Sequence, residues 1–183
     1  MKTGKSSLRK EMLIRRNNYV HKELSDQFIF HKLIDICKDY TKIFTYINYR
    51  SEVDTSAFIK HELKQSKEIY APICNTWNCT MIASRINNWA SLQKNEFGIP
   101  EPQFSDASDI EFDAIIIPGS VFDITGNRIG YGKGYYDKFI NSIDYEVKKI
   151  ALCYDFQLLN VIPSEDHDVK MDIIITENRT VLL

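Results

Sequence analysis

The 183-residue sequence has few of the residues that interrupt regular structure, with seven glycines and five prolines, and it contains no repeat or low-complexity stretch. A collagen-like chain is excluded, and 44% hydrophobic with 26% charged residues disfavours both disorder and a coiled coil. The sequence also lacks any run near the ~20 apolar residues that a membrane span requires. We therefore expect one globular domain over residues 1–183, with no membrane partner.

Positive charge is not in excess, because 23 Lys and Arg stand against 25 Asp and Glu. A general nucleic-acid binder carries a large basic surplus, so no nucleic-acid partner is expected. The four cysteines form no C-x-x-C pair, and Cys37 and Cys153 lie in apolar runs, which predicts reduced core thiols. The polar start, Met1 to Lys5, leads into no apolar segment, so we expect no secretory signal and a cytoplasmic protein.

Predicted helices and strands alternate along the chain. Hydrophobic periodicity predicts helices over the first 20 residues, 23–40, 55–66 and 134–142, and strands over 42–49, 68–73, 80–86, 113–117, 149–154 and 172–176. This order is typical of an α/β fold with three layers: an open, largely parallel sheet with helices on both faces. Residues 95–108 are expected to form one ordered connecting loop.

The N-terminal helix carries three basic residues, Lys5, Arg9 and Arg16, in the stripe that its apolar residues flank. One interpretation is that their long stems cover apolar surface while the charged heads reach water. The other is that Lys5 and Arg9, one turn apart, point at an anionic ligand.

Glycine is concentrated in one place, since five of the seven glycines fall between Gly119 and Gly134. The segment GNRIGYGKG (126–134) follows an apolar strand and precedes a helix, where α/β sheets bind ligands. Glycines admit a phosphate close to the backbone, and Arg128 and Lys133 add positive charge. The spacing matches neither the Walker A nor the dinucleotide pattern, so the prediction is an unclassified phosphate loop, with a tight hairpin as the alternative.

Two carboxylates accompany this loop. Asp137 lies one helical turn after Lys133, and Asp172 opens the last predicted strand. Carboxylates together with nucleotide phosphates and waters suit Mg²⁺, although each Asp could instead cap a helix or a strand. The acidic run from Glu165 to Asp168, with His167 inside it, could bind a metal or be an ordinary surface loop.

The stretch IIPGSVFDITGNRIGYGKGYYDKF (116–139) resembles the signature of the 5-formyltetrahydrofolate cyclo-ligases, also called 5,10-methenyltetrahydrofolate synthetases. Other features of that family follow in the same order: Lys5, Leu8 and Arg9; Glu52 to Thr55; Ile99 to Pro102; and Pro163 to Asp168, leading to Asp172. The resemblance covers nearly the whole chain.

The resemblance implies ATP-dependent conversion of 5-formyltetrahydrofolate to 5,10-methenyltetrahydrofolate, with ADP and phosphate released and Mg²⁺ as cofactor. ATP would phosphorylate the formyl oxygen, after which the folate N10 closes the ring. Phosphoryl transfer mainly requires alignment and neutralisation of charge. We expect a monomer whose partners are ATP and the folate.

The resemblance also implies roles for individual residues. The implied nucleotide contacts are Lys5, Ser6, Ser7, Leu8, Arg9, Arg128, Ile129, Gly130, Tyr131, Gly132, Lys133, Gly134, Tyr135 and Tyr136. The implied folate contacts are Ile47, Glu52, Tyr131, Gly132, Lys133, Gly134 and Tyr135, with Phe97 as a second apolar wall beside Ile47. Lys133, Arg128 and Tyr135 are expected to act in catalysis, and Asp137 and Asp172 to bind Mg²⁺. Ile47 and Phe97 could equally be core residues.

Two positions depart from the family pattern. Tyr131 stands where some relatives carry Arg, and Ile73 follows Pro72 where relatives often have a basic residue. Two other functions stay open: a non-catalytic nucleotide- or folate-binding protein, and a metal-dependent hydrolase using Asp137, His167 and Asp172.

Overall fold

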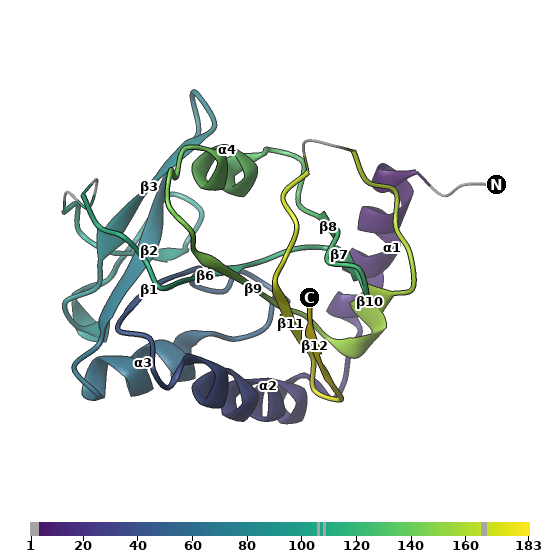
Figure 1. Ribbon diagram of the computed structural model, residues 1–183, viewed down its shortest axis with the longest axis horizontal. Helices are drawn as coiled ribbons and strands as arrows, with labels where there is room; N and C mark the ends of the chain where they lie inside the picture. The colour runs from purple at the N-terminus through teal and green to yellow at the C-terminus, as the bar shows by residue number, and fades with distance from the viewer. Residues whose placement is uncertain (1–3, 106, 108, 166–167) are drawn as a thin grey trace.

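The computed structural model describes residues 4–105, 107, 109–165 and 168–183 (Figure 1). Its main sheet has seven strands in the order β12-β11-β9-β6-β1-β2-β3. The strands are β1 (Lys42–Thr45), β2 (Glu68–Asn75), β3 (Thr80–Arg85), β6 (Ala114–Ile117), β9 (Lys148–Leu152), β11 (Ile173–Ile175) and β12 (Thr180–Leu182). The five inner strands run parallel, and the edge strands β3 and β12 run antiparallel to their neighbours.

Helices cover both faces of this sheet. Helices α2 (Lys22–Cys37) and α3 (Ser56–Lys64) lie on one face and α4 (Tyr135–Asn141) on the other (Figure 1). In β6, Ile116 packs into the core beneath α2 and α3, whereas Ile115 and Ile117 pack into the core on the α4 side. A strand that is apolar on both faces requires cover on both, so the predicted three-layer α/β fold is confirmed.

A second, smaller sheet lies beside the first and was not predicted. It consists of β10 (Leu158–Leu159), β7 (Val121–Asp123) and β8 (Arg128–Ile129). Helix α1 (Lys5–Asn17) packs on it, with Leu8 and Met12 against Val121 and Ile129. This small sheet carries the glycine-rich segment toward α4.

The turn between β7 and β8 is organised by the buried carboxylate of Asp123. It accepts hydrogen bonds from the amides of Thr125, Asn127 and Ile162 at 2.9–3.0 Å, and from the Asn127 side chain at 2.9 Å. Burial alone would raise the pKa of Asp123, but these hydrogen bonds outweigh burial and lower it. Asp123 therefore fixes the conformation of the turn that leads into Arg128.

The remaining elements are short. They are the 3₁₀ turns Trp89–Ser91 and Asp155–Gln157, and the strands β4 (Gln93–Lys94) and β5 (Pro100–Glu101). The expectation of a single loop over 95–108 was wrong in part, because β5 pairs with β4 around Gly98; Asp106 and Ser108 lie outside the described residues.

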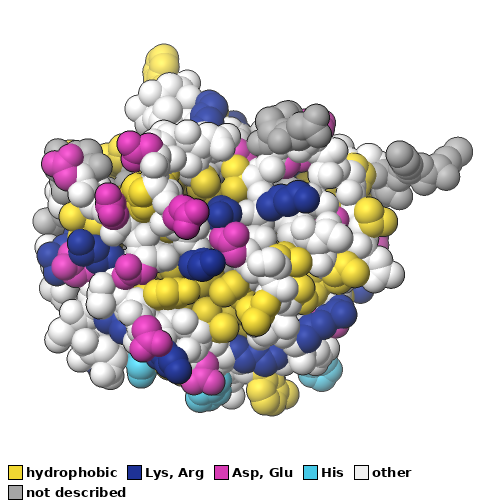
Figure 2. Space-filling view, in the orientation of Figure 1, with side chains coloured by type: hydrophobic (Ala, Val, Ile, Leu, Met, Phe, Trp, Pro, Cys, Tyr) yellow, Lys and Arg dark blue, Asp and Glu magenta, His cyan; other side chains and the backbone are white. Residues whose placement is uncertain are grey.

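Cys37 and Cys153 are buried and free, as predicted. Among the described residues, no helix has the length and apolar character to cross a membrane. Figure 2 shows acidic and basic side chains interspersed over the face it presents.

Candidate active site

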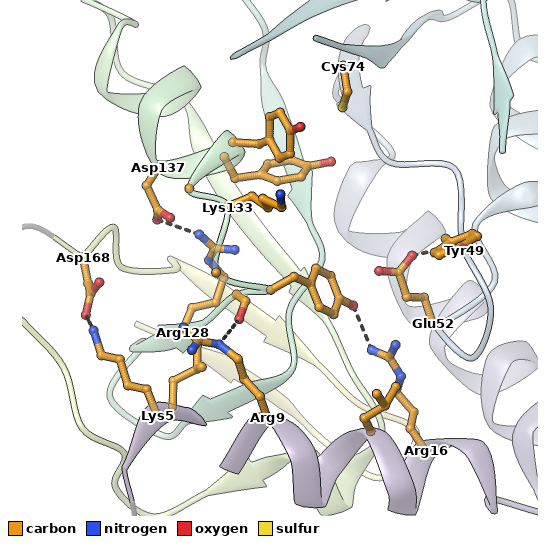
Figure 3. A pocket seen from close by; sticks show the side chains of 18 of the residues that line it. Lys5, Arg9, Arg16, Tyr49, Glu52, Cys74, Arg128, Lys133, Asp137 and Asp168 are labelled. Atoms are coloured by element: carbon orange, nitrogen blue, oxygen red, sulfur yellow. Dashed lines mark hydrogen bonds and ion pairs between the residues drawn. The ribbon is translucent and has the colours of Figure 1, made fainter. Parts of the chain in front are cut away.

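A cavity of about 630 Å³ lies between α1, the loop from β8 to α4 and the segment that follows β1 (Figure 3). The segment after β1 and the segment after β6 both leave the main sheet at the carboxyl ends of parallel strands, where α/β folds bind ligands. The segment after β6 continues through β7 and β8 into the glycine-rich loop. Lys5, Arg9, Glu52 and Asp137 line the cavity, together with the whole of the predicted loop from Arg128 to Tyr136.

Gly130 and Gly132 show why this loop requires glycine. Gly132 has a φ of 93°, a conformation that side chains with a Cβ rarely adopt. A Cβ at Gly130 would lie 2.8 Å from Nη1 of Arg128. The backbone thus passes close over Arg128, and the exposed Lys133 stands at its tip.

The three basic residues of the inward stripe of α1 reach toward the cavity. Lys5 Nζ lies 2.7 Å from a carboxylate oxygen of Asp168, and Arg9 Nε donates to the carbonyl of Gly130 at 2.7 Å. Arg16 is 6% exposed and donates to the Tyr131 hydroxyl at 2.8 Å. The geometry therefore favours the interpretation in which the charged groups of these residues face the cavity over the one in which they reach bulk water.

Arg128 is held rigidly beneath the loop. Its Nη2 lies 2.6 Å from Oδ1 of Asp137, and its Nη1 donates to the carbonyl of Pro118 at 3.2 Å. Its Nε is buried and has no hydrogen-bond partner among the described residues. Asp137, in the first turn of α4, keeps a third of its side chain exposed toward the cavity.

The opposite end of the cavity is formed around Glu52. Its Oε2 accepts the amide of Tyr49 at 2.7 Å. Burial raises the pKa of Glu52, and the neighbouring Tyr131 hydroxyl, the hydrogen bond from the Tyr49 amide and the charge of Arg16 oppose that rise.

Tyr136 adds an unused polar atom to the cavity wall. Its hydroxyl is buried, and no described residue hydrogen-bonds to it. Burial raises the pKa of Tyr136 well above its usual range, so the phenol stays protonated. A buried hydroxyl without a protein partner can serve a bound ligand.

Several predicted contacts lie elsewhere. Leu8 packs in the core, Ser7 is exposed, and Ser6 lines a separate hollow on the side of α1. Ile47 belongs to the core beneath α2, and Phe97 is exposed and does not line the cavity. For Ile47 the geometry favours the packing alternative.

The prediction that Asp172 shares a metal site with Asp137 was wrong. Asp172 precedes β11 and therefore lies at the amino end of the parallel strands, in a hollow with Asp113. Its carboxylate accepts the backbone amide of Lys149 at 2.7 Å and pairs with the Lys149 ammonium at 2.9 Å. Asp172 therefore caps the start of a strand, which is the alternative to metal binding that the sequence left open.

A metal at this site would need ligands from outside the protein. Among the described residues, no group of three or more His, Cys, Asp or Glu could hold an ion. Asp137 fits an ion whose other ligands are phosphate oxygens and waters, the coordination that Mg²⁺ commonly keeps. The hydrolase hypothesis is weakened because Asp137 and Asp172 line different hollows. Its third residue, His167, lies outside the described residues.

Sequence reasoning missed Arg16, Tyr49 and Cys74 as cavity-lining residues. Arg16 could have been found, since an arginine within an inward helical stripe requires a partner when it is buried. Tyr49 and Cys74 carry no such signal.

The family comparison matches residues 1–177 to the 5-formyltetrahydrofolate cyclo-ligase family. A probable 5-formyltetrahydrofolate cyclo-ligase of Caenorhabditis elegans is 28% identical over 199 residues, covering 100% of this chain and 97% of the relative. The 5-formyltetrahydrofolate cyclo-ligase of Mus musculus is 32% identical over 149 residues, covering 75% and 73%.

Solved structures agree with this assignment. The 5,10-methenyltetrahydrofolate synthetase of Aquifex aeolicus has a TM-score of 0.82 and 29% identity, over 97% of this chain and 92% of that one. A synthetase from Mycoplasma pneumoniae, at 24% identity and a TM-score of 0.76 over 94% and 98%, supports the fold alone. The chain belongs to the 5-formyltetrahydrofolate cyclo-ligase family.

Proposed function

We propose that this cyclo-ligase converts 5-formyltetrahydrofolate to 5,10-methenyltetrahydrofolate, with conversion of ATP to ADP and phosphate, in the cavity between α1 and the glycine-rich loop. One observation carries the assignment of the site: a single cavity has cationic side chains from α1 and the loop at one end and the buried Glu52 at the other. This arrangement suits a triphosphate and a ring with N–H donors held side by side.

The chemical problem is the formamide carbonyl, which is a poor electrophile for N10. The formyl oxygen attacks the γ-phosphorus and ADP leaves, which gives an iminium phosphate. N10 then attacks the formyl carbon and gives up its proton to phosphate or solvent. The C–O bond breaks, so phosphate departs with the former formyl oxygen. Both steps depend on alignment and on neutralising phosphate charge.

Lys133 and Arg128 supply that neutralisation. Lys133 stands exposed at the loop tip, free to follow the transferred phosphoryl group. Arg128 is fixed by Asp137 and Pro118, so it holds phosphates at a constant position. Lys5 and Arg9 extend the cationic end along α1.

Mg²⁺ bound with ATP would be held by Asp137, and its chemistry is to neutralise the phosphate oxygens during transfer. Asp137 has a partly exposed carboxylate in the cavity, and Arg128 engages only one of its oxygens within hydrogen-bond distance.

Glu52 and Tyr136 serve the folate ring. An ionised carboxylate accepts paired hydrogen bonds from a ring N–H and an adjacent amino group, and the unpartnered Tyr136 hydroxyl can donate or accept a further one. Tyr135 lines the cavity beside it and gives the ring an aromatic wall.

We further propose that the protein acts as a monomer in the cytoplasm. The free thiols of Cys37 and Cys153 fit a reducing compartment. Sedimentation at working concentration tests the monomer, and fractionation of cells tests the compartment.

The experiment is an absorbance assay of the methenyl product, run with each of ATP, Mg²⁺ and 5-formyltetrahydrofolate omitted in turn. The proposal predicts product only in the complete mixture, with one ADP formed for each methenyl group. Ligand binding without product would identify a binding protein, and phosphate release without folate would identify a hydrolase.

A further inference from the structure

Two of the cations that line the cavity, Arg50 and Lys133, form no ion pair with any described residue. Lys133 belongs to the glycine-rich loop, and the proposed reaction gives it the transferred phosphoryl group. Arg50 lies in the segment after β1, two residues before Glu52, and the proposed reaction leaves it unused. An exposed arginine that lines the cavity and lacks a counter-charge in the described part of the chain is available to an anionic part of a ligand.

The turn that carries Arg50 is held in place by hydrogen bonds on both sides. The Glu52 amide donates to the Tyr49 carbonyl at 3.2 Å, and the Tyr49 amide donates to Oε2 of Glu52 at 2.7 Å. The Ser51 hydroxyl donates to Oδ1 of Asn17 at 2.7 Å, which ties the turn to the last residue of α1. The backbone of Arg50 is therefore fixed relative to Glu52.

Arg50 has an unfavourable backbone conformation in this turn. Its φ is 54°, in the left-handed region that favours glycine. A glycine would form the same turn without that cost, so the large side chain stands here against the local preference. Strained residues of this kind gather at ligand-binding sites, and Arg50 lines the cavity.

An aromatic ring orients the guanidinium of Arg50. Its Cζ lies 4.7 Å from the centroid of the Tyr49 ring, within the range of a cation–π contact. Figure 3 shows Tyr49 beside Glu52, across the cavity from Lys5 and Asp168. The contact with the ring uses no oxygen of the protein, so the N–H donors of Arg50 stay free to bind a carboxylate through two parallel hydrogen bonds.

We propose that Arg50 is a specificity-determining residue that binds the glutamate carboxylates of the folate. The inference rests on the proposed function, in which Glu52 meets the N–H donors of the pteridine ring. Those donors and the glutamate lie at opposite ends of the folate, so a ring held at the buried Glu52 directs the glutamate toward the opening of the cavity. Arg50 is exposed at that opening, and its charge is complementary to the carboxylates. The cations that serve the nucleotide lie on the other side, on α1 and the glycine-rich loop.

The test compares two ligands that differ only in this charge. One is 5-formyltetrahydrofolate, and the other is the 5-formyltetrahydropteroyl amide, in which a neutral primary amide replaces the glutamate. In Arg50→Gln we expect the Kd of the folate to rise about fivefold, the effect of one exposed ion pair, and the Kd of the amide to change by less than about twofold. Added salt should weaken folate binding more in the wild type than in Arg50→Gln, because screening acts on the ion pair.

Two further variants separate the guanidinium from the turn. Arg50→Gly fits the left-handed conformation, so it should keep a Tm close to that of the wild type while it raises the Kd of the folate as Arg50→Gln does. The matched control is Arg15→Gln, since Arg15 is also exposed and lies 4.9 Å from the centroid of an aromatic ring, that of Phe156, but does not line the cavity. It should leave the Kd of both ligands unchanged.

The Kd values are measured by calorimetry without ATP. Equal affinity of the wild type for the two ligands, or an equal loss for both in Arg50→Gln, would overturn the proposal. A raised Kd for ATP with an unchanged Kd for the folate would also overturn it, because Arg50 would then serve the nucleotide. Failure of the proposed function is recognised separately, as absence of methenyl product from the wild-type protein in the complete mixture.

Discussion

The guanidinium of Arg128 lies 2.6 Å from the carboxylate of Asp137, and this ion pair joins the two ends of the glycine-rich loop. Arg128 belongs to β8, which leads into the glycine-rich turn, and Asp137 belongs to the first turn of α4, which follows it. Two residues expected to serve phosphate and metal separately thus form one unit. The pair holds the loop ends together while Gly130 and Gly132 let the backbone between them pass close to a ligand.

Asp137→Asn should raise the Mg²⁺ concentration needed for half-maximal activity by about tenfold, because a neutral amide is a weaker ligand for a hard cation. The measurement is initial rate against free Mg²⁺ at saturating ATP and folate. Asp144→Asn, an acid just beyond α4 that does not line the cavity, is the control and should leave the requirement unchanged. An unchanged requirement in Asp137→Asn would remove Asp137 from the metal site.

Asp172→Asn should behave in the opposite way. It weakens the cap on the Lys149 amide and the ion pair with the Lys149 ammonium, so the free energy of unfolding should fall by about 1 kcal/mol. The Mg²⁺ requirement should not change, because the residue lies at the amino end of the strands. Urea unfolding and the same Mg²⁺ titration check both halves, and a raised requirement would restore Asp172 as a ligand.

Lys133→Ala should lower kcat by about 10²–10³, the cost of removing one group that stabilises transition-state charge. Its Tm should match that of the wild type, because the side chain is exposed and flanked by glycines. Lys138→Ala changes another exposed lysine, in α4, that does not line the cavity, and should retain wild-type turnover. Wild-type kcat in Lys133→Ala would contradict the assigned role.

Glu52→Gln should unfold less readily than the wild type near neutral pH. Burial raises the pKa of Glu52 in the folded protein, so its contribution to stability is fully present below the pKa of the unfolded chain and is lost as pH rises through the folded value. The amide avoids the burial of a charge and can still accept from Tyr49. Urea unfolding at several pH values should show a larger free energy of unfolding for Glu52→Gln than for the wild type, with a difference that shrinks as the pH falls. A difference that grows on acidification would mean that the pKa of Glu52 is lowered in the folded protein.

The sequence predicted most of what surrounds the loop. The concentration of glycines indicates where the loop lies, between the apolar strand β6 and the helix that begins near Tyr135. The positions of Lys5 and Arg9 on the helical wheel predict that both side chains face the loop. It could not predict β7 and β8, since strands of two or three residues have no measurable periodicity. Nor could it pair Arg16 with Tyr131, because 115 positions separate them.

The error over Asp172 has a clear physical reason. A residue that opens a parallel strand lies at the amino edge of the sheet, whereas a loop that follows a strand lies at the carboxyl edge. Asp172 comes before a parallel strand, whereas Asp137 comes after the loop that follows the strands, so the two residues lie apart. Their shared residue type and their match to a family pattern do not change this. Applied to the sequence, the same rule places Glu52, which follows β1, on the correct edge.

The central claim, that the formyl oxygen is phosphorylated in this cavity, is tested most directly by tracing that oxygen. 5-Formyltetrahydrofolate labelled with ¹⁸O in the formyl group is converted with unlabelled ATP and Mg²⁺, and the released phosphate is analysed by mass spectrometry. The account predicts one ¹⁸O atom in each phosphate formed together with methenyl product. Unlabelled phosphate, with the ¹⁸O recovered in water, would contradict it.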